Sequence, residues 1–188
     1  MEEQKFVSRA GEKLAFAIEQ FNLDLHGKVC ADFGCSTGGF TDCMLQNGAE
    51  KVYAVDTAYG ELAWKLRNDP RVVVKEKSNA MHIELPEKVD FLTIDTSWTR
   101  QHFILPNAIE NSKQDAQIVS LIKPHYEADK KLLHKGKLSA DDAFQVTEET
   151  VLKIEETLPL KSLGLVKSPI VGKKGDNAEY LVLWKKTH

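Results

Sequence analysis

The stretch Cys30-Ala-Asp-Phe-Gly-Cys-Ser-Thr-Gly-Gly-Phe-Thr41 decides how this chain is expected to fold. It begins as an apolar strand, breaks into a loop of small residues, and resumes from Phe40 as an apolar helical pattern. A strand that leads through a glycine-rich turn into a helix places bare backbone and a helix N-terminus beside a ligand. Gly34, Gly38 and Gly39 have no Cβ atom and can adopt the positive φ angles that such a turn needs.

The loop lacks the patterns of the two common phosphate-binding turns. No lysine lies between residues 29 and 50, as a Walker A loop would require, and Ser36 stands where a dinucleotide-binding loop carries its middle glycine. Acidic residues stand instead inside the motif (Asp32) and at the end of the next strand (Asp56). They suit a ligand with an ammonium group and a ribose diol, and S-adenosylmethionine has both. The alternative is a βαβ unit whose glycines only make a tight turn.

Strand patterns alternate with helix patterns along the rest of the chain, and a β-hairpin pattern ends it. This order predicts an α/β fold with a mostly parallel sheet, a C-terminal antiparallel hairpin and helices on both faces. Ser8 is expected to cap the first helix, and the lysine-rich segment 129–139 is expected to be a mobile loop. The expected helices are residues 8–20, 41–46, 60–67, 103–110 and 140–158, and the expected strands are residues 29–33, 51–56, 71–75, 89–95, 116–122, 163–167 and 179–184.

Bulk composition limits the class of protein. A chain of 188 residues with 42% hydrophobic and 28% charged residues fits one soluble domain, residues 1–188, with a proper core. No apolar run reaches membrane-spanning length, and three cysteines favour a reducing, cytoplasmic compartment. The six histidines are scattered, so no structural metal is expected. The net charge of −3 means that nucleic-acid binding would need a local basic patch.

The ends of the expected strands carry polar or charged residues. Parallel α/β sheets bind ligands beyond the carboxyl ends of their strands, near the point where the strand order reverses. Turn-forming residues would dominate these positions by chance, so their character favours a functional cleft. The residues are Asp32 to Gly34, Asp56, Glu76 with Asn79, Asp95 and Lys123.

Four charged residues could act together in such a cleft: Lys13 on the first helix, Asp95, Lys123, and Glu179 at the start of the last strand. Each also has a simpler interpretation, since strand-end charges are common. Lys13 could be a solvated helix residue and Asp95 a helix cap. Lys123 could form a strand-end salt bridge, and Glu179 could be a surface charge on the hairpin.

Several segments, in order along nearly the whole chain, carry a family resemblance. They are Ser8-Arg-Ala-Gly-Glu-Lys-Leu14, Asp32-Phe-Gly-Cys-Ser-Thr-Gly-Gly-Phe-Thr-Asp42, Val52-Tyr-Ala-Val-Asp-Thr-Ala-Tyr-Gly-Glu-Leu-Ala-Trp-Lys-Leu-Arg67, Asp69-Pro-Arg-Val72, Leu121-Ile-Lys-Pro124 and Glu179-Tyr-Leu-Val182. The chain resembles the TlyA or hemolysin A branch of the FtsJ-like RNA 2′-O-methyltransferases. The resemblance implies a Rossmann-like methyltransferase fold with a seven-stranded sheet, S-adenosylmethionine as methyl donor, and RNA, most often ribosomal RNA, as substrate.

The resemblance also implies a Lys-Asp-Lys-Glu catalytic tetrad, which falls on Lys13, Asp95, Lys123 and Glu179. A free lysine titrates near 10.4 and is a poor base at neutral pH. Partial burial and a second lysine would both lower its pKa, because each disfavours the ammonium form. We therefore expect Lys123 to be the base and Lys13 to lower its pKa. Asp95 is expected to position Lys123, and Glu179 to hold Lys13.

Further residues are expected at the cofactor and at the RNA. The glycine loop should surround the methionine part of the cofactor, Asp56 should bind the ribose hydroxyls, and Asn79 with Ala80 should meet the adenine edge. Tyr53, Tyr59 and Trp64 are expected to be packing residues, whereas Trp98 could stack on a base. The complete expected cofactor set is Asp32, Gly34, Cys35, Ser36, Thr37, Gly38, Gly39, Phe40, Asp56, Thr57, Asn79, Ala80 and Asp95, and the expected RNA contacts are Arg9, Trp98, Arg100, Lys173 and Lys174.

The chain departs from the family pattern in two places. The family usually carries an N-terminal S4 RNA-binding domain, so we expect either a fragment or a protein that finds RNA without that module. The segment from Trp98 to Gln101 replaces an expected apolar run. Two other functions stay open from the sequence: a non-catalytic cofactor- and RNA-binding protein, and a methyltransferase for a small molecule. Neither the target nucleotide nor the oligomeric state can be predicted.

Overall fold

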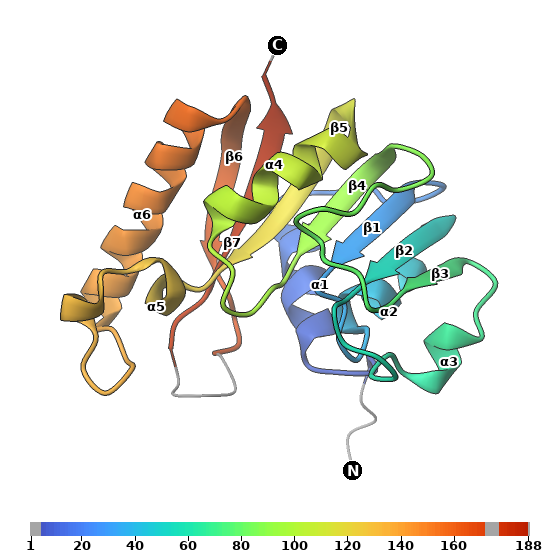
Figure 1. The fold of residues 1–188 in the computed structure, drawn as a ribbon, viewed down its shortest axis with the longest axis horizontal. Coiled ribbons are helices and arrows are strands. Elements are labelled where there is room, and N and C mark those ends of the chain that lie inside the picture. The colour runs from blue at the N-terminus through green and yellow to red at the C-terminus, as the bar shows by residue number, and fades with distance from the viewer. Residues whose placement is uncertain (1–4, 172–176, 188) are drawn as a thin grey trace.

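Seven strands form one mixed sheet in the computed structural model, which describes residues 5–171 and 177–187 (Figure 1). The strand order is β3-β2-β1-β4-β5-β7-β6. The pairs among β1 to β5 are parallel, whereas β7 pairs antiparallel with both β5 and β6. The strands are β1 (Val29–Phe33), β2 (Lys51–Val55), β3 (Val72–Lys75), β4 (Val89–Ile94), β5 (Ser112–Ile122), β6 (Leu160–Lys167) and β7 (Tyr180–Lys186).

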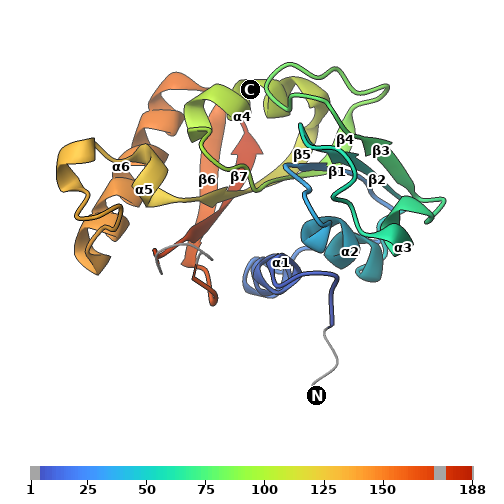
Figure 2. The same ribbon diagram turned by 60° about the horizontal axis from the view of Figure 1, so that its bottom comes forward.

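Helices cover both faces of the sheet, as expected (Figure 2). The helices α1 (Ala10–Gln20) and α2 (Gly39–Gln46) lie on one face. The helices α4 (Gln101–Asn111) and α6 (Ala140–Thr157) lie on the other. Three short helices stand in the connections: α3 (Trp64–Arg67), α5 (Pro124–Glu127) and the 3₁₀ turn η1 (Lys130–Leu132).

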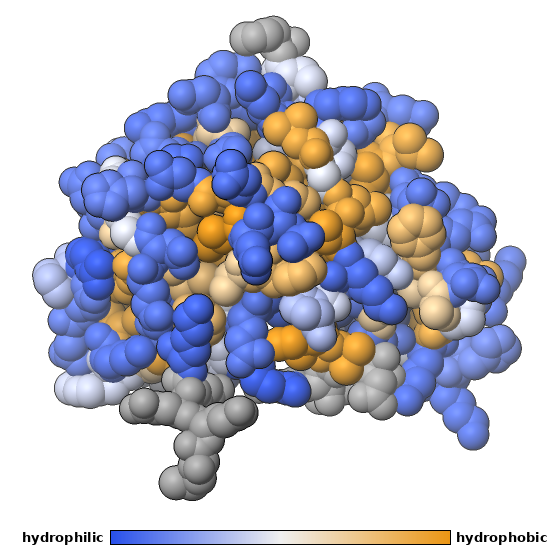
Figure 3. Space-filling view, turned by 180° about the vertical axis from the view of Figure 1, so that it is seen from behind, coloured by the Kyte–Doolittle hydropathy of each residue, from blue (hydrophilic) through white to orange (hydrophobic). Residues whose placement is uncertain are grey.

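The alternation of side chains along each strand divides the core into two layers. In β1, Cys30 belongs to the cluster that α1 and α2 cover, whereas Ala31 and Phe33 belong to the cluster under α4 and α6. The strands β1, β2 and β4 are buried on both faces, which explains their nearly continuous apolar sequences. Seen from behind, the surface is mainly hydrophilic, with hydrophobic side chains showing between charged ones (Figure 3).

The strand order reverses at β1, and this positions the ligand site. The strand β1 has β2 on one side and β4 on the other, so the loops that follow β1, β2 and β4 meet at one edge of the sheet. Gly34 stands at this point with φ +88°, and a Cβ atom there would lie 2.5 Å from the carbonyl oxygen of Asp95. Only glycine allows the ends of β1 and β4 to approach so closely.

Several expected boundaries were wrong. Ser8 does not cap α1, because Arg9 is the N-cap residue and no side chain caps the helix. The expected helix 60–67 shrinks to Trp64–Arg67, since Gly60 has φ +78°, which is outside the helical range, and its N–H bonds to Glu76 Oε1 at 2.9 Å. The segment 129–139, expected to be a mobile loop, contains η1 and an antiparallel bridge between His134 and Lys137.

Two of the three aromatic residues expected to pack are exposed. Tyr53 is buried, and its hydroxyl donates to Glu87. Tyr59 is 72% exposed and Trp64 77% exposed, because the bends before α3 carry both away from the core. Lys77 Nζ lies 4.5 Å from the centre of the Tyr59 ring, in a cation–π contact.

Candidate active site

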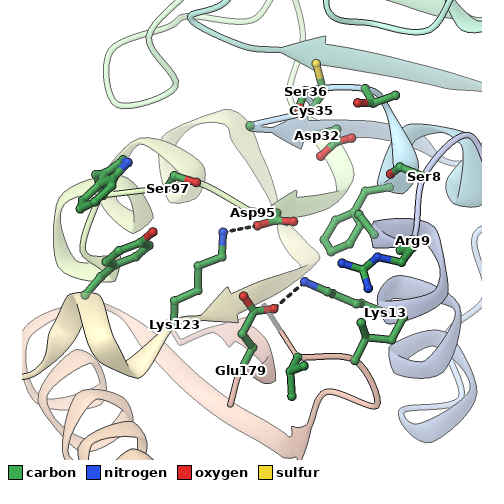
Figure 4. Close-up of a pocket in the computed structure, with 18 of the residues that line it drawn as sticks. Ser8, Arg9, Lys13, Asp32, Cys35, Ser36, Asp95, Ser97, Lys123 and Glu179 are labelled. Carbon is green, nitrogen blue, oxygen red and sulfur yellow. Dashed lines mark hydrogen bonds and ion pairs between the residues drawn. The ribbon is translucent and has the colours of Figure 1, made fainter. Parts of the chain in front are cut away.

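A cavity of about 320 Å³ opens at this edge of the sheet. Its wall combines the start of α1, the loop after β1, the turn after β4, the segment after β5 and the segment before β7. All four residues of the expected tetrad line it: Lys13, Asp95, Lys123 and Glu179. Figure 4 shows their side chains converging on one space from four different elements.

A close contact between two helix starts brings Lys13 to the cavity. A Cβ atom on Gly39 would lie 2.8 Å from the backbone nitrogen of Gly11 and would collide with Ser8 Oγ, so α1 meets α2 only because position 39 is glycine. Gly39 has a helical φ, whereas Gly34 and Gly38 have the positive φ angles that glycine permits. Its function is to let α1 approach, which places Lys13 one turn into α1 at the cavity.

The four side chains form two ion pairs. Lys13 Nζ lies 2.5 Å from Glu179 Oε2, and Lys123 Nζ lies 2.6 Å from Asp95 Oδ1 (Figure 4). Lys123 also donates to the carbonyl oxygen of Thr96 at 3.2 Å. The side chains are between 4% and 18% exposed, so the charges are nearly removed from water. The expected partners, Asp95 for Lys123 and Glu179 for Lys13, are therefore present, and the four formal charges cancel.

The expected direction of the Lys123 pKa was wrong. Burial lowers the pKa of Lys123, but the charge of Asp95, its hydrogen bond and the charge of Glu179 outweigh burial and raise the pKa above the ordinary value. The carboxylates prevail because one is in direct contact with the amine. Lys123 is therefore an ammonium group at neutral pH in this structure.

Asp32 lies at the back of the first cavity with no exposed surface. Its Oδ2 accepts hydrogen bonds from the backbone N–H of Thr41 at 2.9 Å and from Thr41 Oγ1 at 2.7 Å, and its Oδ1 accepts from Thr93 Oγ1 at 3.1 Å. Burial raises the pKa of Asp32 to about 7, and these hydrogen bonds lower it only in part. These bonds fix the end of β1 to α2 and β4.

A second cavity, of about 330 Å³, shares Gly34, Ser36, Asp95, Ser97 and Trp98 with the first. The charged residues in its wall are all acids: Asp56, Glu61 and Asp95. No lysine or arginine is among the described residues that line this cavity, so Asp56 and Glu61 suit a ligand that brings hydroxyl donors and positive charge. The ribose diol and the sulfonium of S-adenosylmethionine meet this requirement, so the residues present fit that cofactor.

Most of the expected cofactor residues lie around these two cavities. Gly38 and Gly39 face elsewhere, since a Cβ atom on Gly38 would contact Leu62 and Leu66 in the core. Asn79 makes a turn in which its Oδ1 accepts from the N–H of Met81 at 2.9 Å. The expected residues in the wall of the first cavity are Asp32, Gly34, Cys35, Ser36, Thr37, Phe40 and Asp95, and those in the wall of the second are Gly34, Ser36, Asp56, Thr57, Asn79, Ala80 and Asp95.

The expected RNA contacts are placed less uniformly. Arg9 lines the first cavity beside Lys13, and Trp98 lines both cavities with 80% of its surface exposed. Arg100 is exposed, and its Nε donates to the carbonyl oxygen of Tyr126 at 3.1 Å. Lys173 and Lys174 lie outside the described residues.

Sequence reasoning missed Tyr126 and His125, which line the first cavity. The ring centres of Tyr126 and Trp98 are 5.0 Å apart, and those of Tyr126 and His125 are 4.1 Å apart. Burial and the charge of Lys123 lower the pKa of His125, so its ring is neutral at pH 7. Their position directly after Lys123 was an available signal, because any residue just beyond a strand end of this sheet can face the ligand.

The cysteines Cys30, Cys35 and Cys43 are buried and free. Burial raises the pKa of the Cys35 thiol above its ordinary value, although this residue lines the first cavity. Within residues 5–171 and 177–187, no group of three or more His, Cys, Asp or Glu side chains could hold a metal ion. No helix in the same ranges has the length and hydrophobicity to cross a membrane.

The fold and the site define a class, the S-adenosylmethionine-dependent methyltransferases. A structure of that class from Listeria monocytogenes shares the fold over 95% of this chain, with a TM-score of 0.67 at 14% identity. The model of the family described as "FtsJ-like methyltransferase" matches residues 6–186. The chain belongs to the FtsJ-like methyltransferase family.

The chain is similar within this family to proteins of the TlyA and hemolysin branch, which confirms the resemblance seen in the sequence. It is 40% identical over 192 residues to TlyA of Mycobacterium tuberculosis, named a 16S/23S rRNA (cytidine-2′-O)-methyltransferase. The alignment covers 98% of this chain and 70% of that protein. A structure from Lactococcus lactis, described as a hemolysin, matches with a TM-score of 0.91 at 40% identity, over 97% of this chain and 89% of the other.

Proposed function

We propose that this protein transfers the methyl group of S-adenosylmethionine to a ribose 2′-hydroxyl of RNA, and that the RNA is ribosomal. One observation carries the proposal: Lys13, Asp95, Lys123 and Glu179 meet in one cavity that adjoins the acidic second cavity. The names of the relatives support the substrate class, since TlyA of Campylobacter jejuni, 31% identical, is named a 23S rRNA (cytidine-2′-O)-methyltransferase.

The two cavities would bind different reactants, the cofactor in the second cavity and the ribose in the first. The cofactor, when bound, supplies an activated methyl group, so the protein must mainly align the hydroxyl and remove its proton. Alignment alone contributes about 7–11 kcal/mol in well-oriented systems. Asp56 and the loop after β1 would hold the cofactor from the second cavity. The ribose hydroxyl would enter the first cavity, where Lys123 and Lys13 face it.

Lys123 is proposed to take the proton. The neutral Lys123 amine would accept the hydroxyl proton when the ribose oxygen receives the methyl group that the cofactor supplies. Because Asp95 holds Lys123 as an ammonium at neutral pH, this amine must first lose its own proton to solvent. Lys13, which is paired with Glu179, would face the hydroxyl oxygen, where a cation stabilises developing negative charge.

The residues at the rim of the first cavity are suited to bind a nucleotide that is part of an RNA chain. Trp98 has φ +64°, a strained conformation for a bulky residue, and its ring stays exposed beside Tyr126. Such a pair of rings can stack on a base, and stacking contributes about 1–3 kcal/mol per base. Arg9 at the opposite rim can meet a phosphate, which a small-molecule substrate would not need.

The test is methyl transfer from radiolabelled S-adenosylmethionine to ribosomal subunits and to extracted ribosomal RNA. Alkaline hydrolysis identifies the product, because a 2′-O-methyl group protects the adjacent phosphodiester bond. We expect Lys123→Ala to lower transfer at least about 100-fold while calorimetry shows that the cofactor still binds. Lys113→Ala, which removes an exposed lysine at the start of β5, is the matched control.

Two results would overturn the proposal. Full transfer by Lys123→Ala would remove Lys123 from the chemistry. Transfer to free nucleosides or other small molecules, with none to RNA, would replace the proposed substrate class by the small-molecule alternative.

A further inference from the structure

The second cavity contains a carboxylate, Glu61, that the sequence did not single out. It lies five residues beyond Asp56, the acid expected to bind the cofactor ribose. The two acids share one neighbour: the backbone N–H of Ser36 donates to Asp56 Oδ2 at 2.8 Å, and Ser36 Oγ lies 3.2 Å from Glu61 Oε2. Ser36, with φ +46°, thus holds two carboxylates on the same side of the loop after β1.

The backbone that carries Glu61 is held on both sides. Gly60 donates its N–H to Glu76 Oε1, and Arg67 pairs with the same oxygen at 2.5 Å. On the other side Leu62 is buried against Gly38. Glu61 itself is exposed, but these anchors fix its Cα atom at the rim of the cavity. A side chain on a fixed backbone loses less conformational entropy when it binds a ligand.

The hydrogen bonds already made at the two acids leave room for two more donors. Asp56 Oδ1 and Oδ2 each accept one backbone N–H, from Ala58 and Ser36, and each oxygen keeps a second lone pair. Glu61 Oε1 has no hydrogen-bond partner within the part of the chain that the structure describes. A diol brings two donors to a place where two carboxylates can each receive one.

We propose that Glu61 is a second ribose-binding residue of the cofactor site, so that Asp56 accepts one hydroxyl of the diol and Glu61 accepts the other. This inference rests on the proposed function, because it takes an adenosine cofactor as the occupant of the second cavity. Ser36 is a positioning residue here, because its hydroxyl orients the Glu61 carboxylate and its N–H orients Asp56.

Calorimetry with S-adenosylhomocysteine and its 2′-deoxy and 3′-deoxy forms tests the contact. A hydrogen bond to a charged acceptor that is open to solvent corresponds to a loss of roughly five- to tenfold in affinity. We expect Glu61→Ala to lower the affinity for S-adenosylhomocysteine by this factor. Glu61→Gln keeps an acceptor oxygen, so we expect it to lower this affinity by less. One of the two deoxy forms lacks the hydroxyl that Glu61 holds. For that form we expect Glu61→Ala and the unchanged protein to have the same affinity. Glu50→Ala removes an exposed acid at the opposite end of β2 and is the matched control.

The outcomes separate this inference from the proposed function. The inference is overturned if Glu61→Ala binds S-adenosylhomocysteine as tightly as the unchanged protein does. It is also overturned if Glu61→Ala lowers the affinity for all three ligands by the same factor. In both cases the methyltransferase assignment stands. If the unchanged protein binds neither S-adenosylhomocysteine nor S-adenosylmethionine, the proposed function fails, and the inference fails with it.

Discussion

The buried ion pair of Lys13 and Glu179 allows stability and activity to be tested separately. Removing one partner of a buried pair leaves an unpaired charge and typically costs about 3–5 kcal/mol. We expect Lys13→Met and Glu179→Gln each to lower the free energy of unfolding by about 3 kcal/mol. This is the lower end of the range, because the cavity lets water reach the remaining charge. The double variant leaves no unpaired charge, so its free energy of unfolding should fall by no more than that of either single variant. The coupling energy is then about 3 kcal/mol.

The assay is urea unfolding at pH 7.5, combined with methyl transfer to RNA by each variant. We expect the double variant to keep the stability of a single one and yet to be at least about 100-fold less active than the unchanged protein. Lys161→Met breaks the exposed pair with Glu155 and is the control, with an expected cost below about 1 kcal/mol. A double variant with unchanged activity would show that the pair is only structural. A coupling energy near zero would refute the electrostatic reasoning.

Three further predictions concern pH and the cavity rim. If Lys123 reacts as a neutral amine, the single-turnover rate should rise about tenfold per pH unit from pH 7 towards its raised pKa; a flat profile would contradict proton removal by Lys123. Trp98→Ala should weaken RNA binding about five- to 100-fold, from a stacking loss of about 1–3 kcal/mol, and should leave cofactor affinity unchanged; equal RNA affinity in a filter-binding titration would exclude stacking. Because the folded-state pKa of Asp32 is raised, the folded protein binds the proton more tightly, and stability should fall as pH rises from about 4 to about 7 and then level off. The difference in unfolding free energy from Asp32→Asn, measured across that range, isolates this contribution, and a difference that does not change with pH would contradict it.

The fold could be predicted because its central strands are buried on both faces. Strands such as β1 and β2 must then be almost wholly apolar, and a short apolar run between turn signals is visible in any sequence. The helix expected over residues 60–67 was wrong at its start, because the backbone before Trp64 depends on a distant residue. Glu76, beyond β3, binds the N–H of Gly60 and holds the preceding residues in bends. Local pattern contains no information on that contact.

The sequence could predict which residues stand at the strand ends of the site, but not the distances between their side chains. Strand topology alone places Asp56 and Asp95 at one edge, whereas Lys13 and Glu179 were only candidates until the family resemblance assigned them to the tetrad. Glu61 was missed because its position depends on a tertiary contact, here with Ser36. The direction of the Lys123 pKa failed for the same reason. It depends on whether an acid or a second amine lies nearer to Lys123, and the sequence gives no distances.

Asp95 connects these results, since it pairs with Lys123 in the first cavity and also lines the second. The same carboxylate that raises the pKa of Lys123 is available to a cation in the second cavity. When Asp95 also neutralises such a cation, its attraction for the Lys123 proton must weaken, because the two positive charges repel each other across one acid. The pKa of Lys123 is therefore expected to be lower with S-adenosylmethionine bound than with the uncharged thioether S-adenosylhomocysteine. In this way a lysine that is an ammonium in the resting site can become a base when the sulfonium is present, and the site needs no second lysine to lower its pKa.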